Sequence, residues 1–281
     1  WNRNYTVKYD ITQALKLDYQ GTAQALVMER PGAIPSSIDS AQAYNEYRDE
    51  VRNSLMAGGE VTNYNHQVNG SYKLPLDKLP LIDFLSSDVR YQSSYRWDRA
   101  PFAQDSLGNT IQNSRNISLN SQANLKNFYN KVPYLKEINN KRRPRPQDRE
   151  VSNEKKDGFG NVIEDEEKDK KEINPLEHIL RFLMGLHNVS ATYARNEGSL
   201  LPGYAFKSRY AGFNNDFTAP GIPFLLGHQY TDVYGNGFGE ATFAYQAAEN
   251  GWLVVQPNLN NQYTESYSEN FNARANLEPI R

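Results

Sequence analysis

The sequence predicts an all-β protein with short helices, in which about seven antiparallel strands form a segment of a very large transmembrane β-barrel with long extracellular loops. Three observations predict this fold. Apolar and polar side chains alternate over long runs, which places them on opposite faces of a strand. Tyrosine and tryptophan recur on the apolar side, as in the aromatic girdles of membrane barrels. Charged residues lie in mid-strand on the polar side, which suits a water-filled interior.

Composition agrees with this fold class. The 281 residues suffice for one large domain or two ordinary ones. A mean hydropathy of −0.78 is typical of disordered chains, but an aromatic content of 12% is not. No stretch approaches the roughly 18 apolar residues of a transmembrane helix. The net charge of −2 argues against a nucleic-acid partner, and the absence of cysteine excludes disulfides and thiolate metal sites.

The first two predicted strands form a hairpin. Residues 1–11 alternate between apolar or aromatic side chains and polar ones, and residues 15–25 do the same. Thr12 and Gln13 lie between the two runs and predict a tight turn. Arg3 is the one residue that breaks the apolar side of the first run.

A longer hairpin forms the centre of the predicted sheet. Alternation covers residues 64–74 and returns over residues 89–97, and in the first of these runs only His66 and Gly70 depart from the apolar set. Residues 75–80 have a proline at each end, and proline lacks the N–H that a strand ladder requires. These residues therefore connect the two strands.

Three further strands follow. Residues 111–125 alternate less clearly, because polar residues dilute the apolar side. Those polar residues are Asn113, Arg115 and Ser121. A short strand is predicted over residues 188–193 and a clear one over residues 263–277.

Connection lengths predict the sides of the membrane, because barrels of this class have short periplasmic turns and longer outer loops. We place three loops outside the cell. They are residues 28–60, which include a helix over 40–56, residues 99–109 and residues 198–258. Two connections lie in the periplasm in this prediction. They are residues 75–87 and an insertion over 126–187, and the insertion contains helices over 128–138 and 176–186. Its charged tract, 141–171, cannot bury enough surface to offset its ordering entropy, so a mobile linker is expected.

The alternation assigns side chains to the two faces. The residues predicted to face the lumen are Lys8, Asp18, Asn63, Arg90, Arg96 and Arg274. The aromatic residues predicted to face lipid are Tyr5, Tyr9, Tyr72, Tyr91, Trp97, Tyr263 and Tyr267.

No motif predicts a catalytic, cofactor-binding or metal site, so we do not expect an enzyme. The glycines of residues 235–239 lack the strand–turn–helix unit of a nucleotide loop, and residues 157–164 lack the aspartate order of a calcium loop. The histidines lack metal-binding spacing, and we interpret them as ordinary surface or strand residues. They are His66, His178, His187 and His228.

A soluble β-sandwich would also alternate, and it stays open as an adhesion domain. Several runs exceed the usual 5–6 residues of a strand and reach the roughly 9–11 that cross a bilayer, which favours the barrel. Both ends of the sequence look cut, and an odd strand number does not suit a closed bacterial barrel. We therefore expect one barrel segment, residues 1–281, of a longer polypeptide.

An ordered series of segments resembles the C-terminal part of the SprA/Sov proteins, the outer-membrane translocons of the type IX secretion system in Bacteroidota. The segments are Glu29-Arg-Pro-Gly-Ala-Ile34, Tyr72-Lys-Leu-Pro75, Lys78-Leu-Pro-Leu-Ile-Asp-Phe84, Val89-Arg-Tyr91, Tyr95-Arg-Trp97, Leu107-Gly-Asn-Thr-Ile-Gln-Asn113, Asn124-Leu-Lys-Asn-Phe-Tyr-Asn130, Tyr134-Leu135 and Gly198-Ser-Leu-Leu-Pro-Gly203. The resemblance covers residues 7–227 and weakens in the charged tract and over residues 235–256. Each motif alone is modest, and the ordered series is more specific.

The resemblance implies a single-chain barrel on the order of 36 strands in the outer membrane of a Gram-negative cell. Its lumen would conduct folded cargo from the periplasm to the cell surface. The implied partners are the rest of the same barrel chain, secreted cargo proteins with C-terminal signal domains, a PorV-type barrel, a plug protein and membrane lipid. An inner-membrane motor would supply the energy. A porin or TonB-dependent transporter of small solutes has the same strand pattern and stays the alternative, with a narrower or plugged pore.

Overall fold

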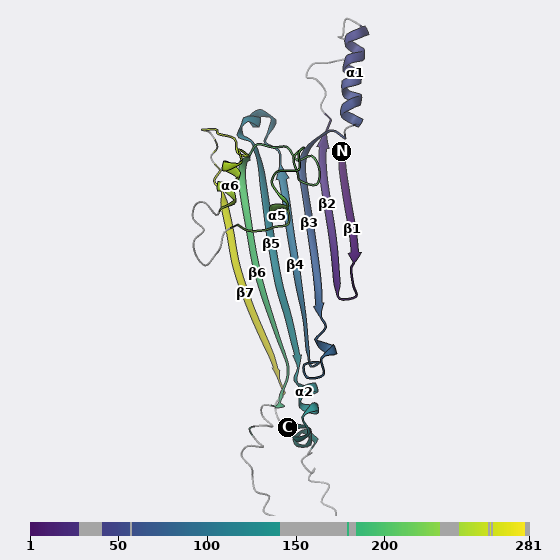
Figure 1. Cartoon of the computed structure of the whole chain (residues 1–281), viewed down its shortest axis with the longest axis vertical. Helices are drawn as coiled ribbons and strands as arrows, with labels where there is room; N and C mark the ends of the chain where they lie inside the picture. The colour runs from purple at the N-terminus through teal and green to yellow at the C-terminus, as the bar shows by residue number, and fades with distance from the viewer. Residues whose placement is uncertain are drawn as a thin grey trace, which may run out of the picture. The chain divides into compact units, whose positions relative to one another are not determined.

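Figure 1 shows the computed structural model of the chain, which describes residues 1–27, 41–56, 58–140, 179, 184–230, 242–257, 259 and 261–278. Within these residues seven strands form one sheet, and each strand pairs with its neighbours in the sequence. The strands are β1 (Asn2–Asp10), β2 (Leu15–Leu26), β3 (Glu60–Leu74), β4 (Leu85–Asp98), β5 (Asn109–Asn124), β6 (Leu186–Tyr204) and β7 (Thr264–Leu277). The prediction of an antiparallel, mainly β fold with about seven strands is confirmed at this level.

The β1–β2 hairpin is closed by the turn predicted at Thr12. The Thr12 Oγ1 atom accepts hydrogen bonds from the N–H groups of Ala14 and Leu15 at 3.2 and 2.9 Å. Such local bonds from threonine favour turns over regular structure. The resulting register places Lys8 opposite Asp18, so polar side chains meet polar side chains across the hairpin.

The same separation of faces continues across β3 and β4. Tyr64 lies opposite Trp97 on one face, and Asn63 lies opposite Asp98 on the other. A one-residue slip would exchange the two faces of a strand, so the alternation itself specifies this register. The connection between these strands contains the short 3-10 helix η2 (Leu76–Lys78), where the prolines had predicted an interruption.

Strand β6 corrects the predicted boundary of the last long connection. The sequence predicted a short strand over residues 188–193 and a loop from residue 198, but β6 has 19 residues. The pattern is hidden because Glu197, an ionisable residue, is only 5% exposed and is paired with Arg195. The strand ends at Tyr204, so the connection to β7 begins at Ala205.

One predicted helix is present in the structure, and another is replaced by two shorter helices. Helix α1 (Ala41–Met56) confirms the helix predicted over residues 40–56. The single helix predicted over residues 128–138 is wrong, because two helices, α2 (Leu125–Lys131) and α3 (Pro133–Asn140), occupy this region. The break falls at Val132, whose φ of −86° and ψ of 112° are extended, as expected for a residue that precedes proline.

The chain divides into two compact units. The first contains Trp1–Pro75, Ser87–Asn120 and Thr192–Asn272, and the second contains Leu76–Ser86, Ser121–Ala191 and Ala273–Arg281. In the second unit, the buried side chains of Tyr129 and Met184 form a small apolar cluster, and the Tyr129 hydroxyl donates a hydrogen bond to the Leu186 carbonyl at 3.1 Å. Burial raises the pKa of Tyr129.

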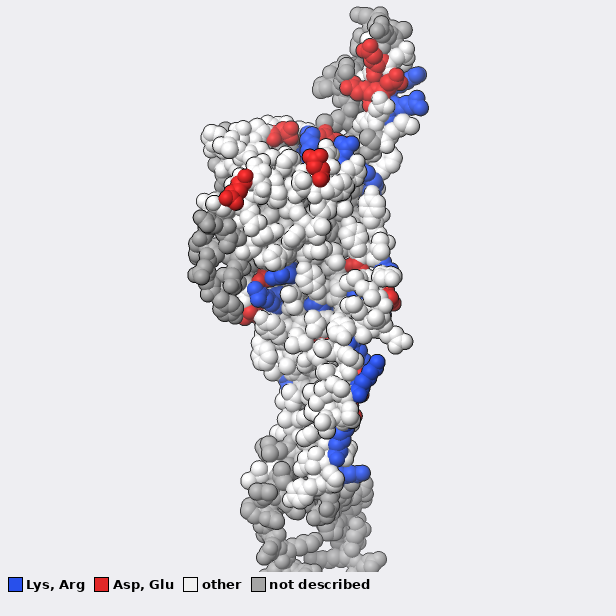
Figure 2. Space-filling view, viewed as in Figure 1, with Lys and Arg blue, Asp and Glu red and all other residues white. Residues whose placement is uncertain are grey.

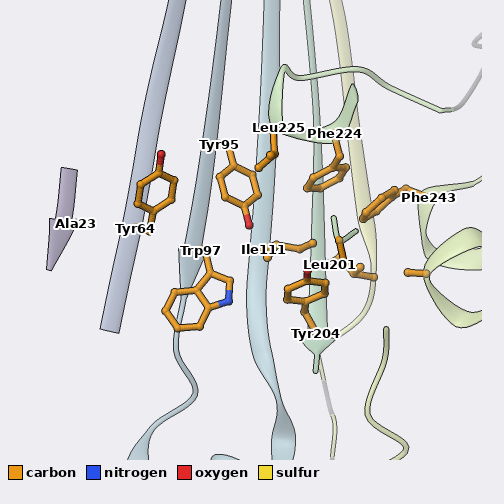
Figure 3. Packing of buried hydrophobic residues seen from close by; sticks show 12 residues of the cluster. Ala23, Tyr64, Tyr95, Trp97, Ile111, Leu201, Tyr204, Phe224, Leu225 and Phe243 are labelled. Carbon is orange, nitrogen blue, oxygen red and sulfur yellow. The ribbon is translucent and has the colours of Figure 1, made fainter. Parts of the chain in front are cut away.

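The main hydrophobic core belongs to the first unit and lies on one face of its sheet. Side chains from β2 to β6 meet residues of the β6–β7 connection there, including helices α5 (Ile222–Leu225) and α6 (Phe243–Glu249). Figure 3 shows Tyr95 of β4 beside Leu225 of α5, and Trp97 next to Tyr95 on the same strand. The rings of Phe224 and Phe243 stack with their centroids 3.8 Å apart. The connection is therefore folded onto the sheet as part of the core.

Some predicted features lie outside the described residues. They are the segment 29–34, the charged tract 141–171, the glycines of 235–239, most of the helix predicted over 176–186, and His178.

Candidate functional site: the two faces of the sheet

The first face of the sheet is polar from β1 to β4 and contains five of the six residues predicted to face a lumen. Lys8 lies opposite Asp18, Asp18 lies opposite Asn69, and Asn69 lies opposite Gln92, so one polar row crosses four strands. The remaining members on these strands are Asn63, Arg90 and Arg96, which the registers place on the same face. The sixth residue, Arg274 of β7, is exposed.

Hydrogen bonds and ion pairs tie the side chains of this polar face to one another. Asn63 donates to Asp98 at 2.6 Å, and the Nε of Arg96 lies 2.7 Å from the same carboxylate. Arg90 pairs with Asp88 at 3.0 Å. Further along, Ser94 and Ser114 are bonded at 2.7 Å between β4 and β5. These contacts leave a polar surface that is compatible with water.

The second face is apolar, and part of it is exposed. The Val7, Tyr9 and Phe271 side chains are 58%, 64% and 70% exposed. Among the residues predicted to face lipid, Tyr5, Tyr9, Tyr72 and Tyr267 are also exposed. In Figure 2, uncharged residues dominate the visible surface, and charged residues gather at the upper rim and in a group lower on the sheet. An exposed apolar sheet face of this kind marks an interaction surface.

The upper part of the apolar face is covered by the chain itself, which corrects the prediction for Trp97. Its side chain is fully buried, and its Nε1–H donates to the Phe206 carbonyl at 3.0 Å. Trp97 is thus a core residue and not a lipid-facing one. Tyr91 is half-buried on the same face, and its hydroxyl donates to the Leu226 carbonyl. Tyr263 is partly buried against the same core.

Side chains of the strands satisfy the backbone of the covering segment, residues 205–230, which we call the docked loop. A buried carbonyl needs a donor, because leaving it unpaired is costly. Asn113 Nδ2 donates to the carbonyls of Phe224 and His228 at 3.0 and 3.2 Å. His66 Nε2 lies 2.8 Å from the Leu225 carbonyl oxygen, and Asn109 Nδ2 donates to Phe206 at 3.0 Å.

Asn113 is fully buried, and all its polar atoms have partners. Its Oδ1 accepts from the Ser199 N–H at 3.2 Å and from Gln229 Nε2 at 3.1 Å. In the sequence, Asn113 is one of the polar residues that weaken the alternation of the fifth strand. That same irregularity, a polar residue on an apolar side, was the signal of a docked backbone.

A buried ion-pair group lies on the same face as the docked loop. The Oε2 atom of Glu197 accepts from Arg115 Nε, and Oε1 accepts from Arg195 Nε, each at 2.8 Å. The Glu197 side chain is 3% exposed, whereas those of Arg115 and Arg195 are 17% and 30% exposed. Two cations share one carboxylate, and Arg195 also lies over the Tyr267 ring at 5.1 Å. The arrangement links β5, β6 and β7 electrostatically.

Two of the described histidines contact other parts of the chain. His66 contacts the docked loop, and His187 Nδ1 lies 3.1 Å from a carboxylate oxygen of Glu278. Across the described ranges, no group of three or more histidine, aspartate or glutamate side chains is arranged to hold a metal ion.

Burial raises the pKa of the Tyr230 hydroxyl, at the end of the docked loop.

None of the helices in the part of the chain that the structure describes has the length and apolar character needed to cross a membrane. The chain matches no model of a known protein family, and no curated protein matches it.

Proposed function

We propose that this chain forms part of the wall of a very large outer-membrane β-barrel that conducts folded proteins from the periplasm to the cell surface. The sheet supplies the wall, its polar face lines the lumen, and the exposed part of its apolar face meets lipid. The sequence resemblance to the SprA/Sov translocons of type IX secretion supplies the class of cargo and the cellular setting.

The single observation that carries this proposal is the two-sided sheet. Polar rows run across β1 to β4 on one face, and aromatic and aliphatic side chains of the same strands occupy the other. A lipid bilayer requires an apolar outer surface on a membrane barrel, and a wide lumen requires a polar inner one. The strands, with 9 to 19 residues, have the length to cross a bilayer at a tilt.

The edges of the sheet support a larger barrel. In the described residues β1 and β7 are the outermost strands, and each pairs on one side only. A strand edge that faces lipid leaves backbone N–H and C=O groups without partners, so a membrane barrel must be closed. We infer that both edges pair with further strands of the same barrel.

Depletion of the protein in its own cells tests this function. Surface proteins with the type IX C-terminal signal domain should accumulate folded in the periplasm, while ordinary porins continue to insert into the membrane. Continued arrival of these proteins at the cell surface would overturn the proposal. Loss of uptake of a small nutrient instead would assign the barrel to solute transport.

A further inference from the structure

A pocket of about 820 Å³ opens on the apolar face of the first unit, beside the docked loop. Strand β1 contributes Arg3, Tyr5 and Val7 to its wall, and the docked loop contributes Lys207 and Arg209. Its size lies within the range of pockets that hold small organic ligands. Every lining residue belongs to the same compact unit of the chain.

The polar part of this pocket is basic. Lys207 pairs with Glu60, which also pairs with Arg99 at 2.7 Å. In the described part of the chain, Arg209 has no acidic partner, and Arg3 donates from Nη2 to the Gly58 carbonyl at 2.9 Å. The Nε of Arg3 is buried and bonded to no described residue. Two guanidinium groups thus retain donors for an anion, and guanidinium groups suit phosphate oxygens.

The remaining wall of the pocket is apolar and aromatic. Tyr5 and Val7 line it and are 47% and 58% exposed, and the next residue on the same face of β1, Tyr9, is 64% exposed. The wall therefore continues along β1 into the open apolar face. A ligand that fits both parts has an anionic head and a long apolar tail. That is the chemistry of a phosphorylated membrane lipid.

We propose that this pocket binds the phosphate-bearing headgroup of a membrane lipid, with Arg3 and Arg209 holding the phosphate and the acyl chain lying along Tyr5, Val7 and Tyr9. The site explains why Arg3 interrupts the otherwise apolar side of β1. It rests on the proposed function, because only a chain in a membrane presents this face to lipid.

Lipid titration of the complete protein, purified in detergent, tests this site. The probes are a short-chain phosphatidic acid, a phosphatidylcholine of equal chain length, and inorganic phosphate, with bound molecules counted by native mass spectrometry. Phosphatidic acid should bind about tenfold or more tightly than either other probe, because only it combines an accessible charged phosphate with an acyl chain.

The double variant Arg3→Gln/Arg209→Gln should lose that preference, and the single variant Arg209→Gln should weaken it about tenfold. Arg209 is exposed and pairs with no described acid, so its loss leaves folding unchanged. The matched control, Arg90→Gln/Arg96→Gln, removes two arginines from the polar face and should bind phosphatidic acid like the wild type. Equal binding of phosphatidic acid by all variants would overturn the site.

The other outcomes also decide the question. Inorganic phosphate that binds as tightly as phosphatidic acid would make this a simple anion site and overturn the lipid assignment. Fractionation of the cells that produce the protein tests the proposed function separately, because it shows whether the protein resides in the outer membrane. A protein that resides in the outer membrane but shows no lipid preference refutes the lipid site alone, whereas a protein recovered as soluble without detergent refutes the barrel itself.

Discussion

The imidazole Nε2 of His66 lies 2.8 Å from the carbonyl oxygen of Leu225, although 159 residues separate them in the sequence. The contact joins the centre of strand β3 to helix α5 of the docked loop. Both partners are buried, so the bond is made where water cannot replace it. It belongs to a set of side-chain donors that hold the docked loop against the apolar face of the sheet.

The substitution His66→Ala should loosen the docked loop. It leaves the Leu225 carbonyl buried without this donor, which costs about 1–3 kcal/mol. Amide hydrogen exchange over residues 205–230 should accelerate, while exchange in β1 and β2 stays as in the wild type. The control Asn65→Ala changes an exposed residue of the same strand on the polar face and should leave exchange unaltered. Unchanged exchange in His66→Ala would show that the bond does not hold the loop.

Trp97→Ala should destabilise the protein far more than Trp1→Ala. Trp97 is fully buried and Trp1 is 61% exposed, so only the first change leaves a cavity in the core. Truncation of a buried tryptophan costs about 3–5 kcal/mol. Thermal unfolding followed by near-ultraviolet circular dichroism compares the two variants. Equal losses would mean that Trp97 is not covered by the docked loop.

Glu197→Gln should destabilise the sheet by about 3 kcal/mol, because it removes the carboxylate that two partly buried arginines share. The control is Glu265→Gln, at an exposed carboxylate of β7. Denaturant unfolding measures the difference between the two variants. If the additional change Arg115→Gln restores part of the stability, repulsion between the unpaired cations is the cause. A loss no larger than in the control would deny the ion-pair group a structural role.

Charge should be tolerated on one face of the sheet and not on the other. Tyr72→Arg places a cation on the exposed apolar face and should cost about 2–4 kcal/mol if the residue lies near the bilayer midplane. Asn69→Arg lies on the same strand on the polar face and should fold and insert almost normally. The two variants are compared by gel electrophoresis of unboiled samples, in which a folded barrel keeps its own band. Similar losses from both changes would refute the assignment of faces.

Alternation predicted much of this sheet, because a period of two is a local property of the sequence. It placed the β1–β2 hairpin, the β3–β4 hairpin and most of β7 correctly. It failed for β6, where Arg195 and Glu197 made the buried side look polar. The ion pair that makes this arrangement stable is formed with Arg115 of another strand, 82 residues away from Glu197, so no local pattern could reveal it.

The docked loop could not be predicted for the same reason. Asn113, His66 and Trp97 contact carbonyl groups more than 100 residues away along the chain. In the sequence, Asn113 and His66 are visible only as polar residues on an apolar side, and Trp97 cannot be distinguished from the other aromatic residues of that side. The basic pocket was marked likewise by Arg3 alone. Three residues that interrupt the alternation, Arg3, His66 and Asn113, thus make contacts with distant parts of the chain.

If the sheet is the wall of a barrel, neighbouring residues of one strand face lipid and water, and fluorescence quenching at Val7 and Lys8 measures this difference. The chain contains no cysteine, so Val7→Cys and Lys8→Cys each give it a single labelling site. The label at position 7 should be quenched by lipids with brominated acyl chains and shielded from aqueous iodide, and the label at position 8 should behave in the opposite way. Equal iodide quenching at both positions, with no effect of brominated lipid at either, would mean that β1 does not separate lipid from water.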